Sequence, residues 1–148
     1  MPFHFPLETV LHFRRSVEHQ QELRLRAANQ QVARMHTLIE HIDRQIASTY
    51  AQQSQDLTTG STAAELQFTS ACRAVLTERR SAAQRESGRL EHLRDLQKKV
   101  FQQARRERET FESLRDHQRT EYERIARRRA QRQLDDLFLT RQTHQRRG

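Results

Sequence analysis

The side chains most able to bind a metal ion in this sequence are its histidines, and their spacing decides whether they can act together. His12 and His19 are two helical turns apart, and His36 and His41 are five residues apart. Two residues of one helix that bind the same metal ion are typically four residues apart. Neither pair has this spacing, so the sequence favours solvated histidines on a helix surface and predicts no metal site.

The sequence supports covalent or acid–base catalysis no better than it supports a metal site. Asp135 and Asp136 are adjacent, and adjacent residues of a helix point about 100° apart, so the two carboxylates mark a polar face. Cys72 is the single cysteine, and only Arg73 beside it would lower the pKa of its thiol. The sequence contains no glycine-rich phosphate loop, no P-loop lysine motif and no nucleophile elbow. The chain is therefore predicted not to be an enzyme and to use no cofactor.

The densest basic cluster is Arg127-Arg128-Arg129 with Arg132. A basic helix that binds nucleic acid would contain such a run, so a basic coiled-coil nucleic-acid-binding protein is one alternative. The cluster has no interleaved aromatic residues, and several acidic residues precede it: Glu107, Glu109, Glu112, Asp116, Glu121 and Glu123. Because these carboxylates weaken the positive field that phosphate binding needs, an acidic protein surface is favoured over nucleic acid.

Composition restricts the fold class to a thin helical protein. The chain has 148 residues, of which 34% are hydrophobic and 31% charged, with three glycines and two prolines. So few apolar residues cannot fill a thick core, and so few helix breakers leave little room for short elements. The net charge of +8 favours acidic partners. One cysteine, no long apolar run and no secretory leader predict a protein that stays in the cell without membrane insertion.

The first helix is predicted over residues 5–54, because Pro6 suits the first helical position and Glu8 suits the first turn. Apolar residues farther along alternate steps of three and four, the spacing of a coiled-coil seam, which is the row of residues that faces a partner helix. This row consists of Leu25, Ala28, Val32, Met35, Ile39, Ile42 and Ile46. The same spacing continued upstream gives Leu7, Leu11, Arg14, Glu18 and Gln21.

Turn-forming residues cluster once in the chain, in the stretch SQDLTTGSTAAE at Ser54–Glu65. We expect a turn at residues 55–61. Thr62-Ala-Ala-Glu65 has the form of a capping box, in which each side chain pairs with a backbone N–H at the start of a helix. A second helix is therefore predicted over residues 62–140, followed by a frayed basic tail at residues 141–148.

The second helix carries a looser apolar row, which holds only alanine between Thr77 and Arg89. Gly88 lies in this stretch, and glycine destabilises a helix interior by about 1 kcal/mol relative to alanine, so the helix could bend there. The row consists of Phe68, Cys72, Val75, Leu76, Ala83, Leu90, Leu93, Leu96, Val100, Ala104, Phe111, Leu114, Tyr122, Ile125, Leu134 and Leu137.

Two helices joined by a short loop must run antiparallel. The predicted fold is therefore all-α, a single coiled-coil domain over residues 1–148 in which two long helices form an antiparallel coiled-coil hairpin with unequal arms. Folding about Leu57–Thr58 would place Ile42 near Ala74–Val75 and would end the first helix opposite Glu109.

Beyond that point the longer second helix would have no partner inside the chain. This part still carries an apolar stripe: Phe111, Leu114, Tyr122, Ile125, Leu134, Leu137 and Phe138. An unpaired apolar stripe on a charged helix usually means that another molecule covers it.

The two ends of the chain read FHFPLETVLHFRR at Phe3–Arg15 and YERIARRRAQRQLDDLFLTRQ at Tyr122–Gln142, and both resemble the flagellar export protein FliJ family. The first stretch resembles the Phe-x-Phe-x-Leu-Glu-x-Val-Leu opening of that family. The stretch YERIARRRAQRQLDDLFLTRQ at Tyr122–Gln142 resembles its Leu-Asp-Asp/Glu ending. The length and the break after a short first helix also agree with the family, so the resemblance covers the whole chain.

The resemblance implies a non-catalytic stalk of the bacterial flagellar type III export apparatus, similar to the central shaft of rotary ATPases and needed for flagellum assembly and motility. Its partners would be the hexameric flagellar export ATPase, the cytoplasmic domain of the membrane export gate, and the export chaperones. It would be cytoplasmic and peripheral to the membrane at the flagellar base. The residues carried over for docking in the ATPase ring are Phe3, Phe5, Leu7, Phe111, Leu114, Tyr122, Ile125, Arg128, Leu134, Leu137 and Phe138.

The resemblance also implies a gate-binding surface on the second helix just past the turn. Its residues would be Phe68, Cys72, Leu76, Arg79 and Ala83. Alternatively, Cys72 and Arg79 belong to a weak part of the seam between the two helices. The stalk of a virulence injectisome has the same architecture, so an injectisome stalk is the nearest alternative function.

Overall fold

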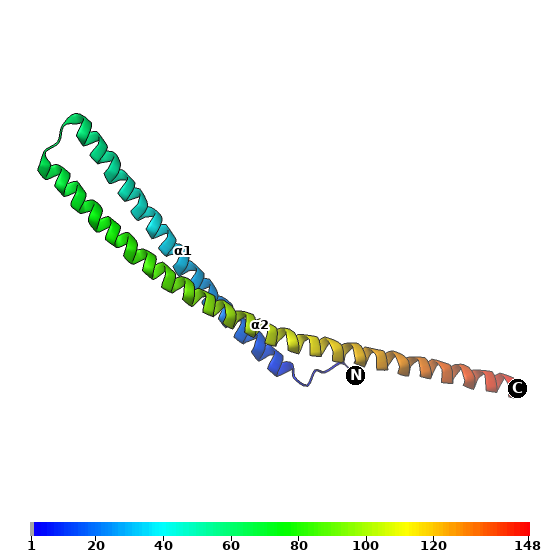
Figure 1. Cartoon of the computed structure of the whole chain (residues 1–148). Helices are drawn as coiled ribbons and strands as arrows, with labels where there is room; N and C mark the ends of the chain where they lie inside the picture. Colours follow the sequence, from blue (N-terminus) through cyan, green and yellow to red (C-terminus); the bar gives the residue numbers. More distant parts are fainter. Residues whose placement is uncertain (1) are drawn as a thin grey trace. The chain divides into compact units, whose positions relative to one another are not determined.

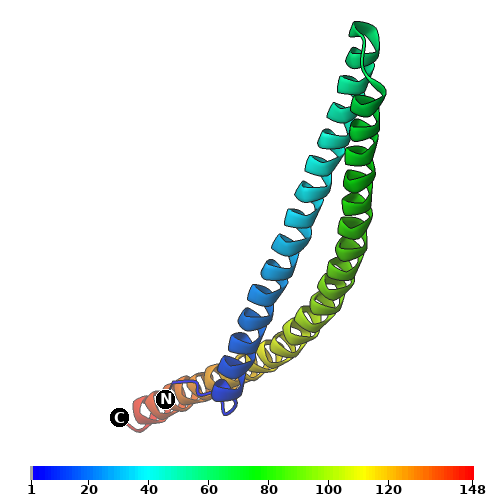
Figure 2. The same ribbon diagram turned by 90° about the vertical axis from the view of Figure 1, so that its left-hand side faces the viewer.

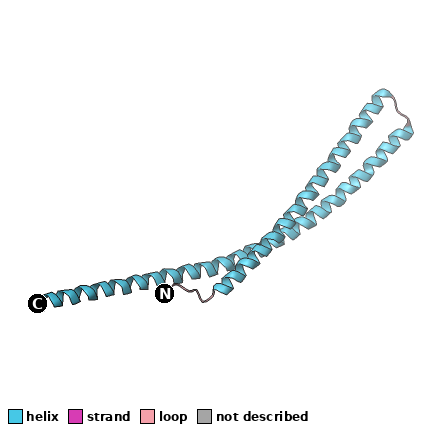
Figure 3. Cartoon of the chain, turned by 180° about the vertical axis from the view of Figure 1, so that it is seen from behind, coloured by secondary structure: helices cyan, strands magenta, loops and turns pink. Residues whose placement is uncertain are grey.

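The computed structural model describes residues 2–148, which form two long helices packed against each other. Helix α1 spans Glu8–Thr59, with 52 residues, and helix α2 spans Ala63–Arg147, with 85 residues (Figure 1). Residues 2–148 contain no strand, as the colouring by secondary structure shows (Figure 3). The predicted all-α fold of two long antiparallel helices with unequal lengths is confirmed.

Helix α1 begins later than predicted, at Glu8 and not at Phe5. The backbone N–H of Glu8 donates to the carbonyl of Phe5 at 3.2 Å, which closes a turn around Pro6 and Leu7 ahead of the helix. The Phe5 side chain is buried, so its apolar contacts hold this segment outside the helix. The preference of Pro6 for the first position of a helix is too weak by itself to override that packing.

The turn is also shorter and later than the predicted range of 55–61. Helix α1 continues to Thr59, and Gly60 follows with φ of 91°, the left-handed conformation that commonly ends a helix and that glycine adopts without strain. The capping box is confirmed: the Glu65 N–H donates to Thr62 Oγ1 at 3.2 Å, and the Thr62 N–H donates to Glu65 Oε2 at 3.3 Å. Gly60 therefore ends α1 and the Thr62 cap starts α2.

Helix α2 runs without interruption through Gly88 and ends at Arg147. The predicted end at residue 140 and the frayed tail at 141–148 are therefore wrong. Basic residues in the last turn, including Arg146 and Arg147, face the negative end of the helix dipole and favour continuation. No residue before Gly148 in this stretch breaks a helix.

The described residues form two compact units. The hairpin unit consists of His19–Gln102 and contains the turn. The terminal unit consists of the residues up to Glu18 together with Gln103–Gly148. The prediction of one domain over the whole chain stays a prediction.

In the hairpin unit, α1 and α2 lie side by side (Figures 1 and 2). They pack along a narrow apolar seam. The α1 seam is the one predicted from spacing, since Val32 and Ile42 are buried and the residues between and beside them at that spacing are half-buried. From α2, the buried partners are Ala83, Ser87 and Leu90. Alternating steps of three and four residues therefore identified the inward face of α1 correctly.

The α2 seam differs from the predicted one, because arginine occupies positions that the apolar pattern missed. The half-buried and buried residues on α2 recur at steps of three and four: Leu66, Thr69, Arg73, Leu76, Arg80, Ala83, Ser87, Leu90, Arg94 and Gln97. Val75, Leu93, Leu96 and Val100 are instead exposed beside this row. Arginine can cover apolar surface with its aliphatic stem while its guanidinium pairs with a polar group, which explains its place in the seam.

The pairing register also differs from the predicted one. Ile42 lies across from Arg79, Ala82 and Ala83, not beside Ala74–Val75. Arg80 pairs with Asp43 in the same region. The difference is about one heptad, because the turn lies later than expected and a slip of seven residues restores the same apolar pattern.

Candidate docking surfaces

The segment before α1 packs against α2 in the terminal unit. The rings of Phe3 and Tyr122 are tilted by 51°, with their centroids 5.6 Å apart. Phe5 and Leu11 are buried, and Leu11 is the most completely enclosed large side chain among the described residues. Tilted aromatic pairs at this separation add to the energy of apolar burial. The structure thus brings together two predicted ring-docking residues, Phe3 and Tyr122, inside the chain.

Next to these apolar contacts, four charged side chains form one cluster. Arg108 donates to both carboxylate oxygens of Glu18, at 2.6 and 3.1 Å, and to Glu112 at 2.6 Å. Arg15 donates to Glu112 at 2.9 and 3.1 Å. The bidentate pair of Arg108 with Glu18 belongs to the strong class of hydrogen bond. Sequence reasoning placed Glu18 in the seam but did not pair it.

The cluster changes the pKa of two of its members. The pKa of Arg108 is raised from its ordinary value, first by its hydrogen bonds to Glu18 and then, against the opposing effect of burial, by those to Glu112. The pKa of Glu112 is lowered, mainly by the hydrogen bonds that Arg15 donates and next by those from Arg108. Both shifts favour the charged forms, of Arg108 and of Glu112.

Ion pairs extend this contact on both sides of the cluster. Arg14 donates to Glu107 at 2.5 Å, and its guanidinium lies 5.9 Å from the ring centre of Phe111. Arg115 pairs with Glu8 at 3.4 Å. The expectation that α2 has no partner inside the chain beyond Glu109 is therefore wrong for the stretch that ends at Tyr122, because the pairing register is shifted and the segment before α1 continues the contact.

The remaining part of α2, residues 123–148, is exposed at every position, and we call it the C-terminal arm. Its large apolar side chains include four from the predicted ring-docking set: Ile125, Leu134, Leu137 and Phe138. Leu139 is also exposed and was missed because it lies off the predicted stripe. Arg128 lies exposed on this arm, whereas the predicted residues Leu7 and Leu114 are exposed outside it.

The five predicted gate-binding residues do not form one exposed stripe. Phe68 and Arg79 are exposed, Cys72 and Leu76 are half-buried, and Ala83 is buried in the seam. A shallow hollow of about 380 Å³ is lined by Ala71, Cys72, Val75, Leu76 and Arg79. Leu76 and Ala83 thus contribute mainly to helix pairing, while the exposed Val75 was not included in the predicted surface.

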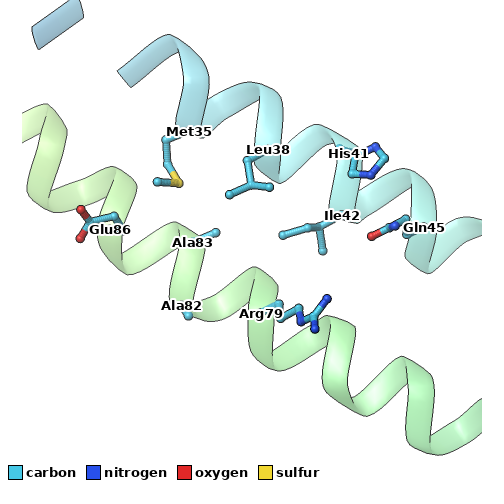
Figure 4. A pocket seen from close by; sticks show the side chains of 9 residues that line it. All are labelled: Met35, Leu38, His41, Ile42, Gln45, Arg79, Ala82, Ala83 and Glu86. Atoms are coloured by element: carbon cyan, nitrogen blue, oxygen red, sulfur yellow. The ribbon is translucent and has the colours of Figure 1, made fainter. Parts of the chain in front are cut away.

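A second hollow in the hairpin unit, of about 490 Å³, lies between the two helices. Met35, Leu38 and Ile42 point from α1 toward α2, where Ala83 faces them (Figure 4). The predicted seam includes three of these four residues, but the hollow itself was missed. The hollow could have been predicted from the alanine-only stretch of α2, because alanine cannot fill the space opposite long aliphatic side chains.

The histidines are single surface residues. His36 Nε2 lies 2.8 Å from Glu91 Oε1, and His19 lies 3.9 Å from Glu22, and all four side chains are partly solvent-exposed. Residues 2–148 contain no group of three or more His, Cys, Asp or Glu side chains that could hold a metal ion. Over the same range, no helix combines the length and the apolar character needed to cross a membrane.

Comparison with known proteins gives one decisive match. The model of the family described as Flagellar FliJ protein matches residues 3–148 of the chain. The chain belongs to this family. No curated protein and no solved structure matches it. Family membership covers both units, and it makes the chain a component of the flagellar export apparatus.

Proposed function

We propose that this FliJ-family chain is the non-catalytic stalk of the export apparatus and that its C-terminal arm docks in the ring of the hexameric export ATPase. The observation that carries the proposal is the exposure of Leu134, Leu137 and Phe138 on an arm whose side chains are exposed throughout residues 123–148. Large apolar side chains exposed together on one short segment favour a partner that covers them.

The rest of the terminal unit would act as a base that holds the arm in place before it docks. Phe3 packs against Tyr122 in a tilted ring pair, and Arg108 joins Glu18 to Glu112, so α2 is held up to the point where the arm begins. A helix that is already ordered loses less conformational entropy on docking than one that must fold. Of the predicted ring-docking set, the C-terminal arm residues would therefore make the direct contacts, and Phe3, Phe5 and Phe111 would hold the base.

The hairpin unit would carry the contacts with the export gate and with the export chaperones. The exposed side chains of Phe68 and Arg79, with the hollow at Cys72, support a gate contact near the turn. These residues lie outside the terminal unit. Ring docking and gate binding would therefore use separate surfaces of one chain.

The test is ATP hydrolysis by the purified flagellar export ATPase, measured alone and with the full chain. A triple variant, Leu134→Gln, Leu137→Gln and Phe138→Gln, removes the apolar surface of the arm but keeps good helix formers. The matched control is Leu23→Gln, Leu96→Gln and Val100→Gln, which replaces exposed apolar residues of the hairpin unit. We expect the control variant to stimulate the ATPase as the unmodified chain does and the arm variant to lose stimulation. Equal stimulation by both variants would contradict docking through the arm.

A further inference from the structure

The hollow lined by Met35, Leu38, Ile42, Ala82 and Ala83 has a structural cause. The α1 side chains Met35, Leu38 and Ile42 are long and aliphatic, whereas α2 presents only the small Ala83 opposite them (Figure 4). Ala82 lines the hollow from its exposed side. The space of about 490 Å³ between the helices is therefore not filled from inside the chain. Apolar surface that borders such a space loses dispersion contacts unless another group enters it.

The hollow opens on one face of the hairpin unit only. Residues three or four apart share a helix face, and on α1 the lining residues Leu38, His41 and Gln45 follow that spacing. Arg79, Ala82 and Glu86 do the same on α2. We call this face, formed by these six residues, the groove. Across the pair of helices, His36 bonds Glu91 at 2.8 Å on the other side.

Exposed apolar side chains continue the groove in both directions along α2. Val75 lies four residues before Arg79, and Leu93 lies seven residues after Glu86, so both continue the same helix face. Val75, Leu93 and, on α1, Leu38 are all exposed. The groove is thus a hollow at the centre of a longer apolar strip, which is the shape that receives an amphipathic helix.

The charge of the groove indicates which kind of molecule would bind there. Glu86 is neutralised by Arg89, which bonds it at 2.6 Å. Arg79 forms no ion pair with any residue in 2–148, and neither does Arg34, which lies one turn from Leu38 on the same face. The groove therefore keeps an excess of positive charge, which favours carboxylates on the docked molecule.

The same charge argues against occupants from this chain. The C-terminal arm contains eight arginines and three acidic residues, and a second copy of the chain carries a net charge of +8. Either one would bring positive charge to a positive groove, which costs energy at close range. A different, acidic protein fits better.

We infer that the groove binds one amphipathic α-helix of an acidic partner protein, whose apolar side chains pack on Leu38 and Ala82 and whose carboxylates face Arg34 and Arg79. Two packed helices accept a third by the same interdigitation of side chains that joins the first two. This surface shares Arg79 with the proposed gate contact, and it adds Arg34 and Leu38 of α1, which neither the ring-docking nor the gate-binding proposal uses.

The experiment uses the full chain and two synthetic helical probes of roughly 18 residues, about 27 Å long. Both probes carry leucines at steps of three and four, flanked by glutamates in one and by lysines in the other. Binding is measured by fluorescence anisotropy with labelled probes. We expect the glutamate probe to bind and the lysine probe not to bind.

Two variants test the groove, and each has a matched control. Leu38→Gln is compared with Leu23→Gln, which is also exposed on α1 but lies off the groove. Arg79→Glu is compared with Lys98→Glu, which makes the same charge change off the groove. We expect each groove variant to weaken binding of the glutamate probe by about tenfold or more, and each control to stay within about twofold.

Failure would be unambiguous. If the glutamate probe does not bind the unmodified chain, or binds all four variants equally, the inference is wrong. If Leu38→Gln proves unfolded by circular dichroism, the Arg79→Glu comparison decides alone. Self-association of the chain that Leu38→Gln abolishes would overturn the acidic partner in favour of a second copy. ATPase stimulation does not measure the groove, so either proposal can fail without the other.

Discussion

The charge cluster of the terminal unit predicts a measurable coupling between Arg108 and Glu18. Arg108 donates two hydrogen bonds to Glu18, at 2.6 and 3.1 Å, and the two side chains are only 19% and 18% exposed. Replacing either residue leaves its charged partner half-buried with fewer hydrogen bonds. The relevant perturbations are therefore Arg108→Gln, Glu18→Gln and the double variant.

The expected coupling free energy between Arg108 and Glu18 lies between two known limits. Hydrogen bonds to charged groups contribute about 1.5–3 kcal/mol in enclosed sites, whereas fully exposed ion pairs contribute about 0–1 kcal/mol. At the exposure of Arg108 and Glu18, we expect a coupling free energy of about 1–2 kcal/mol. Arg108 also pairs with Glu112, so Arg108→Gln removes two ion pairs and should destabilise the chain more than Glu18→Gln, which leaves the Arg108–Glu112 pair in place.

The assay is urea denaturation followed by circular dichroism, with the free energies combined in a double-variant cycle. The pair Arg105–Glu109 is the control, because its side chains are 57% and 51% exposed at a distance of 3.0 Å. Its coupling should be about 0.3–0.5 kcal/mol, as for an ordinary pair on a helix surface. If the Arg108–Glu18 coupling does not exceed that of the control, the cluster is not what holds the terminal unit.

Three further predictions concern the backbone and the effect of pH. Gly88→Ala should raise the free energy of unfolding by about 1 kcal/mol, because the glycine lies inside α2 with open space around an added Cβ; a lower urea midpoint would contradict this. Gly60→Ala should lower it by about 1–2 kcal/mol, since φ is 91°; an unchanged thermal midpoint would show that the turn relaxes. The lowered pKa of Glu112, held down by Arg15 and Arg108, contributes stability that is fully present above its ordinary value of 4.5 and is lost as the pH falls through the lowered value. Glu112→Gln should therefore flatten the acid side of a stability profile, and an unaltered profile would refute the assignment.

The fold class could be predicted from the sequence because two local signals were strong. The row from Leu25 to Ile46 kept strict coiled-coil spacing, and the capping box of Thr62 and Glu65 marked the start of α2. Both depend on residues close together in the chain. The start of α1 was misplaced because the burial of Phe5, a tertiary effect, prevails over the local preference of Pro6.

The register could not be predicted from apolar spacing, because a slip of one heptad preserves that spacing. Polar pairs distinguish the two registers: Arg80 meets Asp43, and Arg108 meets Glu18. A single polar or charged seam residue is a known device for fixing register in coiled coils. Seam arginines were missed because a search for apolar residues does not count them, although Arg73, Arg80, Arg94, Arg108 and Arg115 are all separated by multiples of seven.

The candidate surfaces were partly accessible from the sequence. The apolar stripe near the C-terminus indicated the exposed side chains of Leu134, Leu137 and Phe138. The pairing of Phe3 with Tyr122 could not be read from spacing, because it joins residues far apart in the sequence. The hollow beside Ala83 needed the correct register before its lining residues could be placed together.

The most direct test of the stalk account is to locate the contact with the export ATPase by site-specific photo-crosslinking. Phe138 on the C-terminal arm and Phe68 in the hairpin unit are a matched pair, because they are 68% and 72% exposed. Each is replaced in turn by a photoreactive phenylalanine analogue, and the full chain is irradiated with the assembled ATPase hexamer. The account predicts a crosslink to the ATPase from position 138 and none from position 68. A crosslink from position 68 without one from position 138 would contradict it.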